Sequence, residues 1–404
     1  MSEVKEVRLG DVLKVHHGFA FKSSEFSDDL SYPTIVTPGN FSIGGGFKDA
    51  KPKTFSGDFP PSYELAPGDL VVTMTDLSKQ GDTLGMPAVI PSDRRYLHNQ
   101  RIGLVEVLEP NEVSKSFLSY YLRTRVYKEY VLGTASGSTV RHTSPSRIED
   151  FVAHLPKINT QRAIAEVLGA LDDKIAANNN LARLTNDLAD SVFRQALLKA
   201  EFSNETFADI SRVSGGGTPS TKQPEYWNGD VLWATPTDVT ALMAPYLEGT
   251  SRTITEEGLS ACASELYPAG TILMTSRATI GSFALTQFPT AVNQGFIVVQ
   301  PTDKNLRYWI FHEMRSRVAE FTAFANGATF LELSRGNFKN FRVRQAPYDV
   351  MVKFNETAGS LHKLGRAALV ENQTLSSVRD TLLPQLMSGK IRVRDAEAIV
   401  EDVL

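Results

Sequence analysis

The chain carries at residues 159–198 the stretch NTQRAIAEVLGALDDKIAANNNLARLTNDLADSVFRQALL, which contains no proline and a single glycine. Its apolar residues recur at steps of three and four, the spacing that lines one face of a helix that packs against a second helix. The row is broken around Asn178-Asn179-Asn180. We therefore predict a long helix with an apolar seam at Ile164, Leu168, Leu171 and Ile175, and then at Leu181, Leu184, Leu188 and Val192.

A second stretch of this kind begins after Pro347, with residues spaced by seven from Phe354 to Leu382 and a weaker row from Met351 to Leu386. Pro384 is expected to end or kink this helix. A helix of roughly 40 residues is about 60 Å long, and it is rarely stable alone. We predict that the two helices pair antiparallel as a coiled coil, with a globular domain at each end. The alternative is that each helix packs on its own domain.

The segments that precede the two helices repeat each other. Leu9-Gly10-Asp11-Val12 recurs as Phe207-Ala208-Asp209-Ile210, and Asn99-Gln100 recurs as Asn293-Gln294. A repeat of about half the chain is too long for a solenoid unit and indicates a duplicated domain. Short β-branched runs bounded by proline and glycine make each copy β-rich. We predict an α+β protein with globular domains at 1–155 and 201–347, long helices at 156–200 and 348–390, and a C-terminal tail at 391–404.

The bulk composition is that of a soluble globular protein, with 42% hydrophobic and 22% charged residues. The charged start and the short apolar runs predict a cytoplasmic protein without a membrane segment. Cys262 is the single cysteine, so no intrachain disulfide or cysteine zinc site is expected. The net charge of −4 argues mildly against nucleic-acid binding, although acidic surfaces elsewhere can balance a basic face.

Signatures of catalysis are scarce. The glycine-rich run Gly215–Ser220 lacks the Gly-Lys-Ser/Thr ending of a phosphate loop, so a tight connecting loop is the simpler interpretation. The seven histidines show no metal-binding spacing. His142 lies near Ser138 and Ser144, but no carboxylate spacing supports a catalytic triad. The sequence therefore indicates a protein that recognises a partner, with a hydrolase that uses His142 as a remote alternative.

Loops that mix basic, hydroxyl and aromatic residues occur at equivalent places in both copies, with different side chains. Phosphates need donors, and base edges need forked or short polar side chains. Equivalent loops with changed side chains suit two modules that bind different sequences. The candidate nucleic-acid contacts are Lys22, Ser23, Thr75, Lys79, Arg94, Arg95, Ser138, Arg141 and His142 in the first copy, and Thr218, Ser220, Thr221, Lys222, Tyr226, Trp227, Arg277 and Arg335 in the second.

With these features in hand, the chain resembles the specificity subunits of type I restriction–modification enzymes. Leu155-Pro156 with Gln161 to Ile175 resembles the start of the family's first long helix. Gly216 to Lys222 with Glu225-Tyr226-Trp227 resembles the opening of its recognition domains, and Asn372 to Gly389 the end of its second helix. The second helix departs from the first, because Tyr348-Asp349-Val350 replaces the glutamine-led start.

The resemblance implies that the globular domains are target-recognition domains, each binding one half of a bipartite, asymmetric site in double-stranded DNA. The helices would set the spacer and dock two methyltransferase subunits, which bind S-adenosylmethionine. A restriction and translocase subunit using Mg²⁺ and ATP would join them. This chain would hold no active site and no cofactor of its own.

Surplus apolar residues at the helix ends are candidates for partner docking, because exposed apolar surface often marks an interface. Alternatively, they cap the junction with the neighbouring domain. A different class of function also stays open, namely a two-armed scaffold that joins protein partners and binds no nucleic acid. The docking candidates are Phe193, Leu197, Leu383, Leu386 and Met387.

Overall fold

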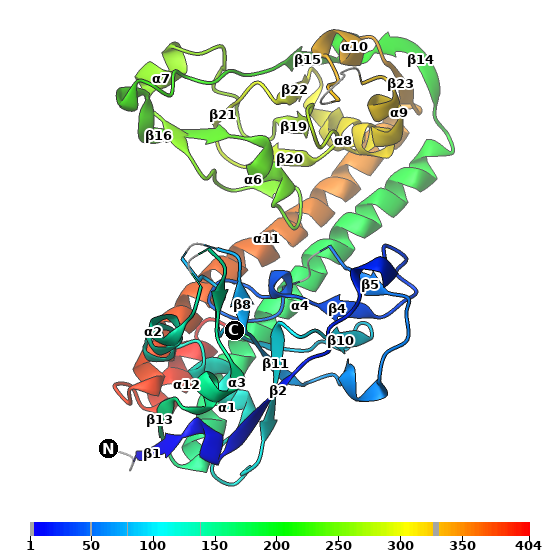
Figure 1. Cartoon of the computed structure of the whole chain (residues 1–404). Coiled ribbons are helices and arrows are strands. Elements are labelled where there is room, and N and C mark those ends of the chain that lie inside the picture. The colour runs from blue at the N-terminus through cyan, green and yellow to red at the C-terminus, as the bar shows by residue number, and fades with distance from the viewer. Residues whose placement is uncertain (1–3, 49–50, 79, 138, 326–330) are drawn as a thin grey trace. The chain divides into compact units, whose positions relative to one another are not determined.

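The computed structural model describes residues 4–48, 51–78, 80–137, 139–325 and 331–404. It divides into two compact units: unit 1 comprises Met1–Ile175 and Thr374–Leu404, and unit 2 comprises Ala176–Gln373. Each unit combines sheets with short helices and includes a part of both long helices (Figure 1). The α+β class predicted from the sequence is confirmed.

Two sheets form the frame of unit 1. Their strands are β2 (Leu13–His17), β3 (Phe26–Ser27), β4 (Thr34–Val36), β5 (Thr54–Phe55), β6 (Glu64–Leu65), β7 (Leu70–Thr73), β9 (Pro87–Val89), β10 (Tyr96–His98) and β11 (Ile102–Val107). One sheet has the order β2-β11-β7-β9 with antiparallel neighbours. The other has the order β3-β5-β4-β10-β6, in which β4 and β10 are parallel. Every residue of β7 is buried, so this strand is covered on both of its faces.

Unit 2 repeats this plan. Its strands are β15 (Ser211–Ser214), β16 (Trp227–Ala234), β17 (Tyr246–Leu247), β18 (Thr253–Ile254), β19 (Ile272–Thr275), β20 (Phe283–Thr286), β21 (Thr290–Val292) and β22 (Phe296–Pro301). The order β15-β22-β19-β20 reproduces the order and the antiparallel pairing of β2-β11-β7-β9, and a fifth strand, β17, pairs parallel with β20. The parallel pair β16–β21 corresponds to β4–β10. The duplication predicted from the sequence is therefore present in the fold.

Short strands and helices complete each copy. Unit 1 has β1 (Lys5–Arg8), β8 (Thr75–Asp76), α1 (Lys115–Tyr121), α2 (Arg125–Thr134), β12 (Arg141–His142), α3 (Pro145–Glu149), β13 (Val152–Leu155) and α12 (Val393–Glu401). Unit 2 has β14 (Glu201–Thr206), α5 (Phe207–Ile210), α6 (Pro236–Thr240), α7 (Glu256–Ser260), α8 (Arg307–Ser316), α9 (Val318–Ala323), α10 (Arg335–Lys339) and β23 (Arg342–Gln345). In each copy, the last strand pairs with the first, β13 with β1 and β23 with β14, and then leads into a long helix.

The long helices are α4 (Ile158–Leu197) and α11 (Tyr348–Met387), and they pair antiparallel. In unit 1 the first half of α4 meets the last part of α11, where Arg379 Nη1 lies 2.7 Å from Asp172 Oδ1. In unit 2 the end of α4 meets the start of α11, where the rings of Phe193 and Phe354 are 5.2 Å apart. The helix α11 continues to Met387, three residues beyond the end expected at Pro384.

The seam of α4 was predicted correctly only in its first half. Ile164, Leu168 and Leu171 are buried in unit 1. In unit 2, however, Leu184 and Leu188 are 48% and 52% exposed. The helix face that is buried there is formed by Asn178, Ala182, Thr185, Ala189 and Phe193.

The physical reason for this shift is a small and polar contact between the helices. At the asparagines, where the apolar row was expected to break, Asn178 Nδ2 donates to Asn372 Oδ1 at 3.0 Å, so these buried polar groups satisfy each other. A Cβ on Gly365 would lie only 2.5 Å from Thr185 Oγ1. Small residues thus bring the backbones together on this face, and the leucines are left outside. The rows predicted for α11 are buried at Phe354, Ala358, Ala368, Leu375, Leu382 and Leu386.

The start of α4 is anchored by the glutamine that carries the family resemblance. Gln161 is fully buried. Its amide donates to the carbonyls of Glu112 at 2.9 Å and Pro156 at 2.8 Å, and it accepts from the Ser114 N–H at 3.0 Å. One side chain therefore ties the helix to the segment that opens α1. The segment predicted as a tail contains α12, whose Ala396 and Val400 are buried in the unit 1 core.

A chain of buried hydrogen bonds ties α4, α8, α11 and β17 together inside unit 2. His312 Nδ1 lies 2.6 Å from Asp190 Oδ1, and His312 Nε2 lies 3.0 Å from His362 Nε2. His362 Nδ1 lies 3.0 Å from the Tyr246 hydroxyl. The two imidazoles are 1% and 2% exposed. The hydrogen bonds between these elements therefore depend on the protonation states of the two imidazoles.

Candidate nucleic-acid interface

A glycine contact builds the same junction in both units. In unit 2, the loop after β15 packs on the turn after β21, and a Cβ on Gly216 would lie 1.9 Å from the Val292 carbonyl oxygen. In unit 1, the segment after β2 packs on the turn after β10, and a Cβ on Gly18 would lie 2.2 Å from the Asn99 carbonyl oxygen. Only glycine permits so close a backbone approach. The glycine-rich run of unit 2 thus serves as a tight loop, as the simpler interpretation held.

A second junction carries different chemistry in the two copies. In unit 1, β8 pairs with β12, and Thr75 Oγ1 lies 3.1 Å from His142 Nδ1. At the corresponding bridge of unit 2, Arg277 faces Glu332, with 2.8 Å between Arg277 Nε and Glu332 Oε1. A hydroxyl–imidazole pair in one copy thus corresponds to a guanidinium–carboxylate pair in the other. The backbone is kept while the polar side chains change.

These segments enclose a cavity of about 470 Å³ in unit 2. Arg277, Arg335 and Lys339 bring three cations to its wall, and Glu332 brings a carboxylate. A Cβ on Gly215 would meet Arg335 Nη1 at 2.9 Å, so this guanidinium lies over the glycine loop. The excess of positive charge suits a phosphate-bearing ligand.

In unit 1, a buried carboxylate organises the loop that follows β8. Burial alone would raise the pKa of Asp76, but hydrogen bonds from the backbone N–H groups of Ser78 and Thr83 lower it below its usual value. The Ser78 N–H donates to Asp76 Oδ1 at 2.6 Å and the Thr83 N–H to Oδ2 at 2.5 Å. The charged form of Asp76 therefore holds this loop in place beside Thr75.

The structure brings some of the sequence-predicted contacts together and separates others. Thr75, Arg141 and His142 meet on the paired strands β8 and β12. Arg277 and Arg335 line one cavity, and Thr218 bonds to Gln294 in the same cavity wall. Exposed side chains on the neighbouring loops are Lys22, Ser23, Ser220, Thr221 and Lys222. Lys79 and Ser138 lie outside the described residues.

Two predicted cations form ion pairs away from these junctions. Arg95 Nε lies 2.7 Å from Glu64 Oε1, and Arg94 Nε lies 2.9 Å from Asp93 Oδ2. Hydrogen bonding to the Glu64 carboxylate raises the pKa of Arg95. The carboxylates of these pairs neutralise part of the positive charge that would otherwise attract a phosphate.

Trp227 belongs to the core of unit 2 and is 9% exposed. Its ring packs edge-on against Trp233 with 5.1 Å between centroids, and the Arg252 guanidinium covers it at 3.6 Å. A base could therefore stack on this ring only after Arg252 moved. The neighbouring Tyr226 is half-buried beside the same cluster.

The docking candidates do not provide the exposed apolar surface on which that prediction rested. Phe193 is 2% exposed and packs against Trp309 and Phe354. Leu386 is 3% exposed in the core of unit 1. Leu197, Leu383 and Met387 are half-buried against the same cores.

His142 is not placed as a catalytic base for Ser144. Its Nδ1 bonds to Thr75, whereas the Ser144 hydroxyl accepts from the Arg147 N–H and caps α3. Among the described residues, no group of three or more His, Cys, Asp or Glu side chains could hold a metal ion. Within the same ranges, every helix is too short or too polar to cross a bilayer.

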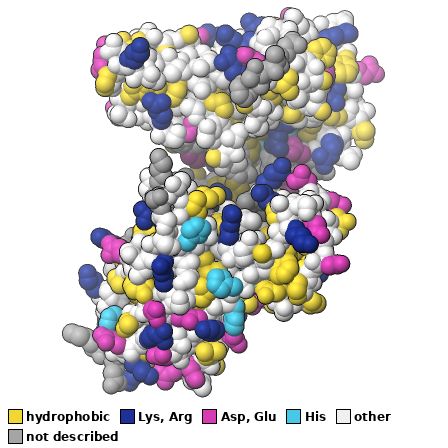
Figure 2. All heavy atoms as spheres, in the orientation of Figure 1, with side chains coloured by type: hydrophobic (Ala, Val, Ile, Leu, Met, Phe, Trp, Pro, Cys, Tyr) yellow, Lys and Arg dark blue, Asp and Glu magenta, His cyan; other side chains and the backbone are white. Residues whose placement is uncertain are grey.

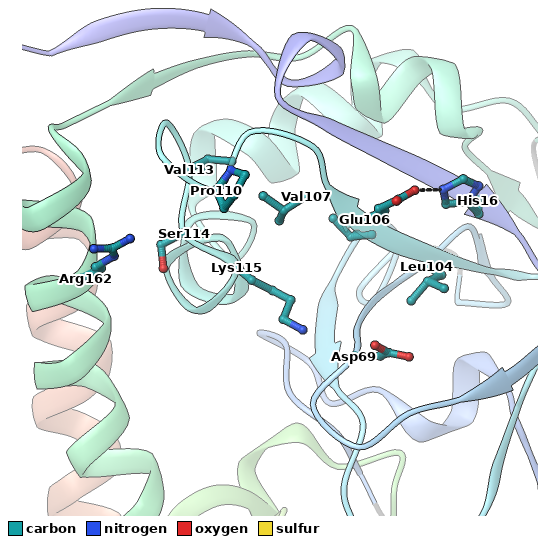
Figure 3. A pocket seen from close by; sticks show the side chains of 11 residues that line it. His16, Asp69, Leu104, Glu106, Val107, Pro110, Val113, Ser114, Lys115 and Arg162 are labelled. Atoms are coloured by element: carbon teal, nitrogen blue, oxygen red, sulfur yellow. Dashed lines mark hydrogen bonds and ion pairs between the residues drawn. The ribbon is translucent and has the colours of Figure 1, made fainter.

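A cavity of about 600 Å³ in unit 1 contains none of the predicted contacts. It lies against β11 and is lined by Asp69, Lys115 and Arg162, with Glu106 bonded to His16 at 2.6 Å (Figure 3). On the face in Figure 2, basic side chains are interspersed with acidic ones and form no single patch. Charge on the visible surface thus singles out neither this cavity nor one broad interface.

Sequence reasoning missed four polar residues at the junctions, namely Gln100, Gln294, Glu332 and Lys339. Gln294, Glu332 and Lys339 line the cavity of unit 2, and Gln100 occupies the place of Gln294 in unit 1. The Asn-Gln dipeptide that recurs in both copies was the signal for two of them. Glu332 and Lys339 have no such signature.

Comparison with known proteins agrees with this duplicated architecture. The model of the type I restriction modification DNA specificity domain matches residues 1–185 and 200–347, one match for each copy. The MjaIX specificity subunit of Methanocaldococcus jannaschii is 37% identical over 137 residues, which cover 33% of this chain and 32% of that protein. A type I specificity subunit of Escherichia coli is 23% identical over 383 residues, which cover 89% and 88% of the two chains.

The crystal structure of a type I S subunit from M. genitalium has the same fold, with a TM-score of 0.56 at 15% identity, covering 95% of this chain and 96% of that one. The chain spans about a third of the length of the first two relatives, 32% of the MjaIX subunit and 37% of the EcoBI subunit of Escherichia coli. Because the family model matches most of the sequence, the chain belongs to the family of type I restriction–modification DNA specificity domains.

Proposed function

We propose that this chain is the non-catalytic DNA-recognition subunit of a type I restriction–modification complex. Each copy would bind one half of a bipartite, asymmetric site in double-stranded DNA. The supporting observation is the pair of equivalent junctions whose backbone is conserved between copies while the polar side chains differ, Thr75 with His142 against Arg277 with Glu332. Two such modules on one chain suit a target with two unlike halves.

In this proposal, 1–155 and 201–347 are the recognition domains, and 156–200 and 348–390 are the helices that set the spacer. Two methyltransferase subunits would dock on the chain and supply the S-adenosylmethionine chemistry. A restriction subunit, where one is present, would supply the steps that use Mg²⁺ and ATP. The polar contacts between the helices favour this role, because a buried asparagine pair fixes the register of a coiled coil.

The decisive experiment is co-expression of the chain with a methyltransferase subunit, followed by mapping of methylated adenines. Exchange of residues 201–347 for those of a relative should change only one half of the methylated sequence. A change in both halves would refute independent recognition. Binding should also weaken steeply with salt, as expected for phosphate contacts. A chain that assembles protein partners without any salt-dependent DNA binding would instead be the scaffold of the alternative class.

The spacer role has its own test. Removing seven residues from each long helix would shorten the pair by about 10 Å, which corresponds to about three base pairs. The spacer of the recognised site should shorten, or binding should fail. An unchanged site would rule out the helices as a ruler.

A further inference from the structure

Both copies present a glutamine on the same asparagine-closed turn. In unit 1, Asn99 Oδ1 accepts from the Arg101 N–H at 3.0 Å, and in unit 2 Asn293 Oδ1 accepts from the Gly295 N–H at 2.8 Å. Each asparagine therefore closes its own turn. The next residues, Gln100 and Gln294, are exposed. The glutamines contribute nothing to the closure of the turn, so the turn alone does not account for their recurrence.

The turn is held rigidly from behind by the glycine junction. Gly216 lies against the Val292 carbonyl and Gly18 against the Asn99 carbonyl, at distances that no side chain would tolerate. A side chain on this turn is thus presented from a fixed backbone. A side chain must be held in a fixed position if it is to distinguish between base edges.

In unit 2 the amide itself is also oriented. The Thr218 hydroxyl donates to Gln294 Oε1 at 2.6 Å. A carboxamide oxygen accepts two hydrogen bonds and its nitrogen donates two, so one acceptor and two donors of Gln294 stay available. That combination matches the N6 and N7 groups of adenine in the major groove. Arg335 and Lys339, in the same cavity wall, could hold the flanking phosphates.

Unit 1 has the glutamine but lacks the hydroxyl. When Gly18 is aligned with Gly216, Ala20 takes the place of Thr218. Among the described residues, no hydrogen bond involves the Gln100 side chain. The two copies therefore present the same amide, which a hydroxyl orients in unit 2 and which has no such partner among the described residues of unit 1.

We infer that Gln294 is a specificity determinant that reads an adenine in the half-site of unit 2, and that Thr218 is its positioning residue. Gln100 holds the equivalent place in unit 1 and discriminates less sharply. This inference rests on the proposed function, because it assumes that the junction faces DNA. It adds to the proposed function the base, adenine, that Gln294 recognises.

The test uses the full chain assembled with its methyltransferase and a set of targets that differ at single base pairs. Gln294→Ala should lower the affinity for the target about tenfold or more and abolish discrimination at one A·T pair. Gln294→Glu should shift the preference at that pair toward cytosine, whose amino group donates to a carboxylate. Thr218→Val should weaken discrimination at the same pair and nowhere else.

The matched control is Gln287→Ala, because the Gln287 amide bonds to the Leu285 carbonyl and lines a different cavity. It should leave every base preference unchanged. If Gln294→Ala binds DNA with all preferences intact, the inference is wrong and the proposed function stands. If the assembled parent complex shows no sequence preference at all, the proposed function fails and the inference fails with it.

Discussion

The buried histidine pair of unit 2 makes a sharp prediction about pH. In the neutral form of His312 the proton lies on Nδ1, because Asp190 only accepts hydrogen bonds, and Nε2 accepts. His362 Nε2 therefore donates to His312, and His362 Nδ1 accepts from the Tyr246 hydroxyl. Both imidazoles are neutral in this chain of bonds. A second proton on either ring would force the hydrogen atoms of this chain of bonds to rearrange.

The size of the effect follows from the pKa of His362. Burial is the main reason that the pKa of His362 is lowered to about 3, and His312 and Arg315 lower it further. Burial also lowers the pKa of His312, although Asp190 opposes this. The unfolded chain binds a proton near pH 6.5, so the stability is fully present above that pH and is lost as the pH falls toward 3. At pH 5, the loss from His362 alone is about 2 kcal/mol.

The assay can be confined to unit 2. The three tryptophans, Trp227, Trp233 and Trp309, all lie in this unit, so their fluorescence during urea unfolding reports on it. His362→Gln keeps a donor and an acceptor at the site but cannot titrate. The stability advantage of the parent over this variant should therefore shrink by about 2 kcal/mol between pH 7.5 and pH 5.

The same chemical change at an exposed position is the control. The His154 side chain is 60% exposed, and His154→Gln should not reproduce the pH-dependent difference. Parallel loss of stability in the parent and in His362→Gln across this range would refute the reasoning. It would mean that the imidazoles are not held neutral by their partners.

Three further predictions concern the junctions, the partner surface and the helix pair. Arg141→Ala and Arg277→Ala should each cost about 1–3 kcal/mol of DNA binding and relax one base position if the side chain reads a base, or lower the salt slope by about one if it holds a phosphate; parental affinity in both variants would reject both contacts. Leu184→Asp with Leu188→Asp should abolish methyltransferase co-purification without unfolding the chain, because these leucines are 48% and 52% exposed. The control variant is Leu364→Asp, at an exposed leucine of α11. Leu375→Ala should destabilise unit 1 by about 2–5 kcal/mol in urea unfolding, because Leu375 is fully buried in the core of unit 1, and a loss below 1 kcal/mol would contradict the packing.

The duplication, the two long helices and the fold class could be predicted because each is a pattern that recurs along the chain. The seam of α4 could not be followed past Asn178, because apolarity alone favours Leu184 and Leu188 over Ala182 and Ala189. The structure chooses the small residues, since a close approach to Gly365 and the Asn178–Asn372 bond are available only on that face. The buried face of α4 is therefore decided by the geometry of α11, which the sequence of α4 does not contain.

The same limit explains the candidate site. Arg277 and Arg335 could be selected by residue type, but their meeting in one cavity depends on the segment after β19 and on helix α10, which are more than 50 residues apart. Phe193 could be recognised as surplus to the seam, but not as covered by Trp309 from another element. The type of a side chain can be read from the sequence, whereas its exposure depends on the fold.

The two copies separate the residues that fix the backbone from the polar residues that differ between them. Gly18 and Gly216 fix the junction through backbone contacts, and Asn99 and Asn293 close the turn through their own side chains. Neither contact uses the side chains at the Thr75–His142 and Arg277–Glu332 bridges. These positions are therefore free to change without loss of the junction. A protein that must acquire new target sequences while keeping its assembly needs this separation, and a duplicated module allows each half to change independently.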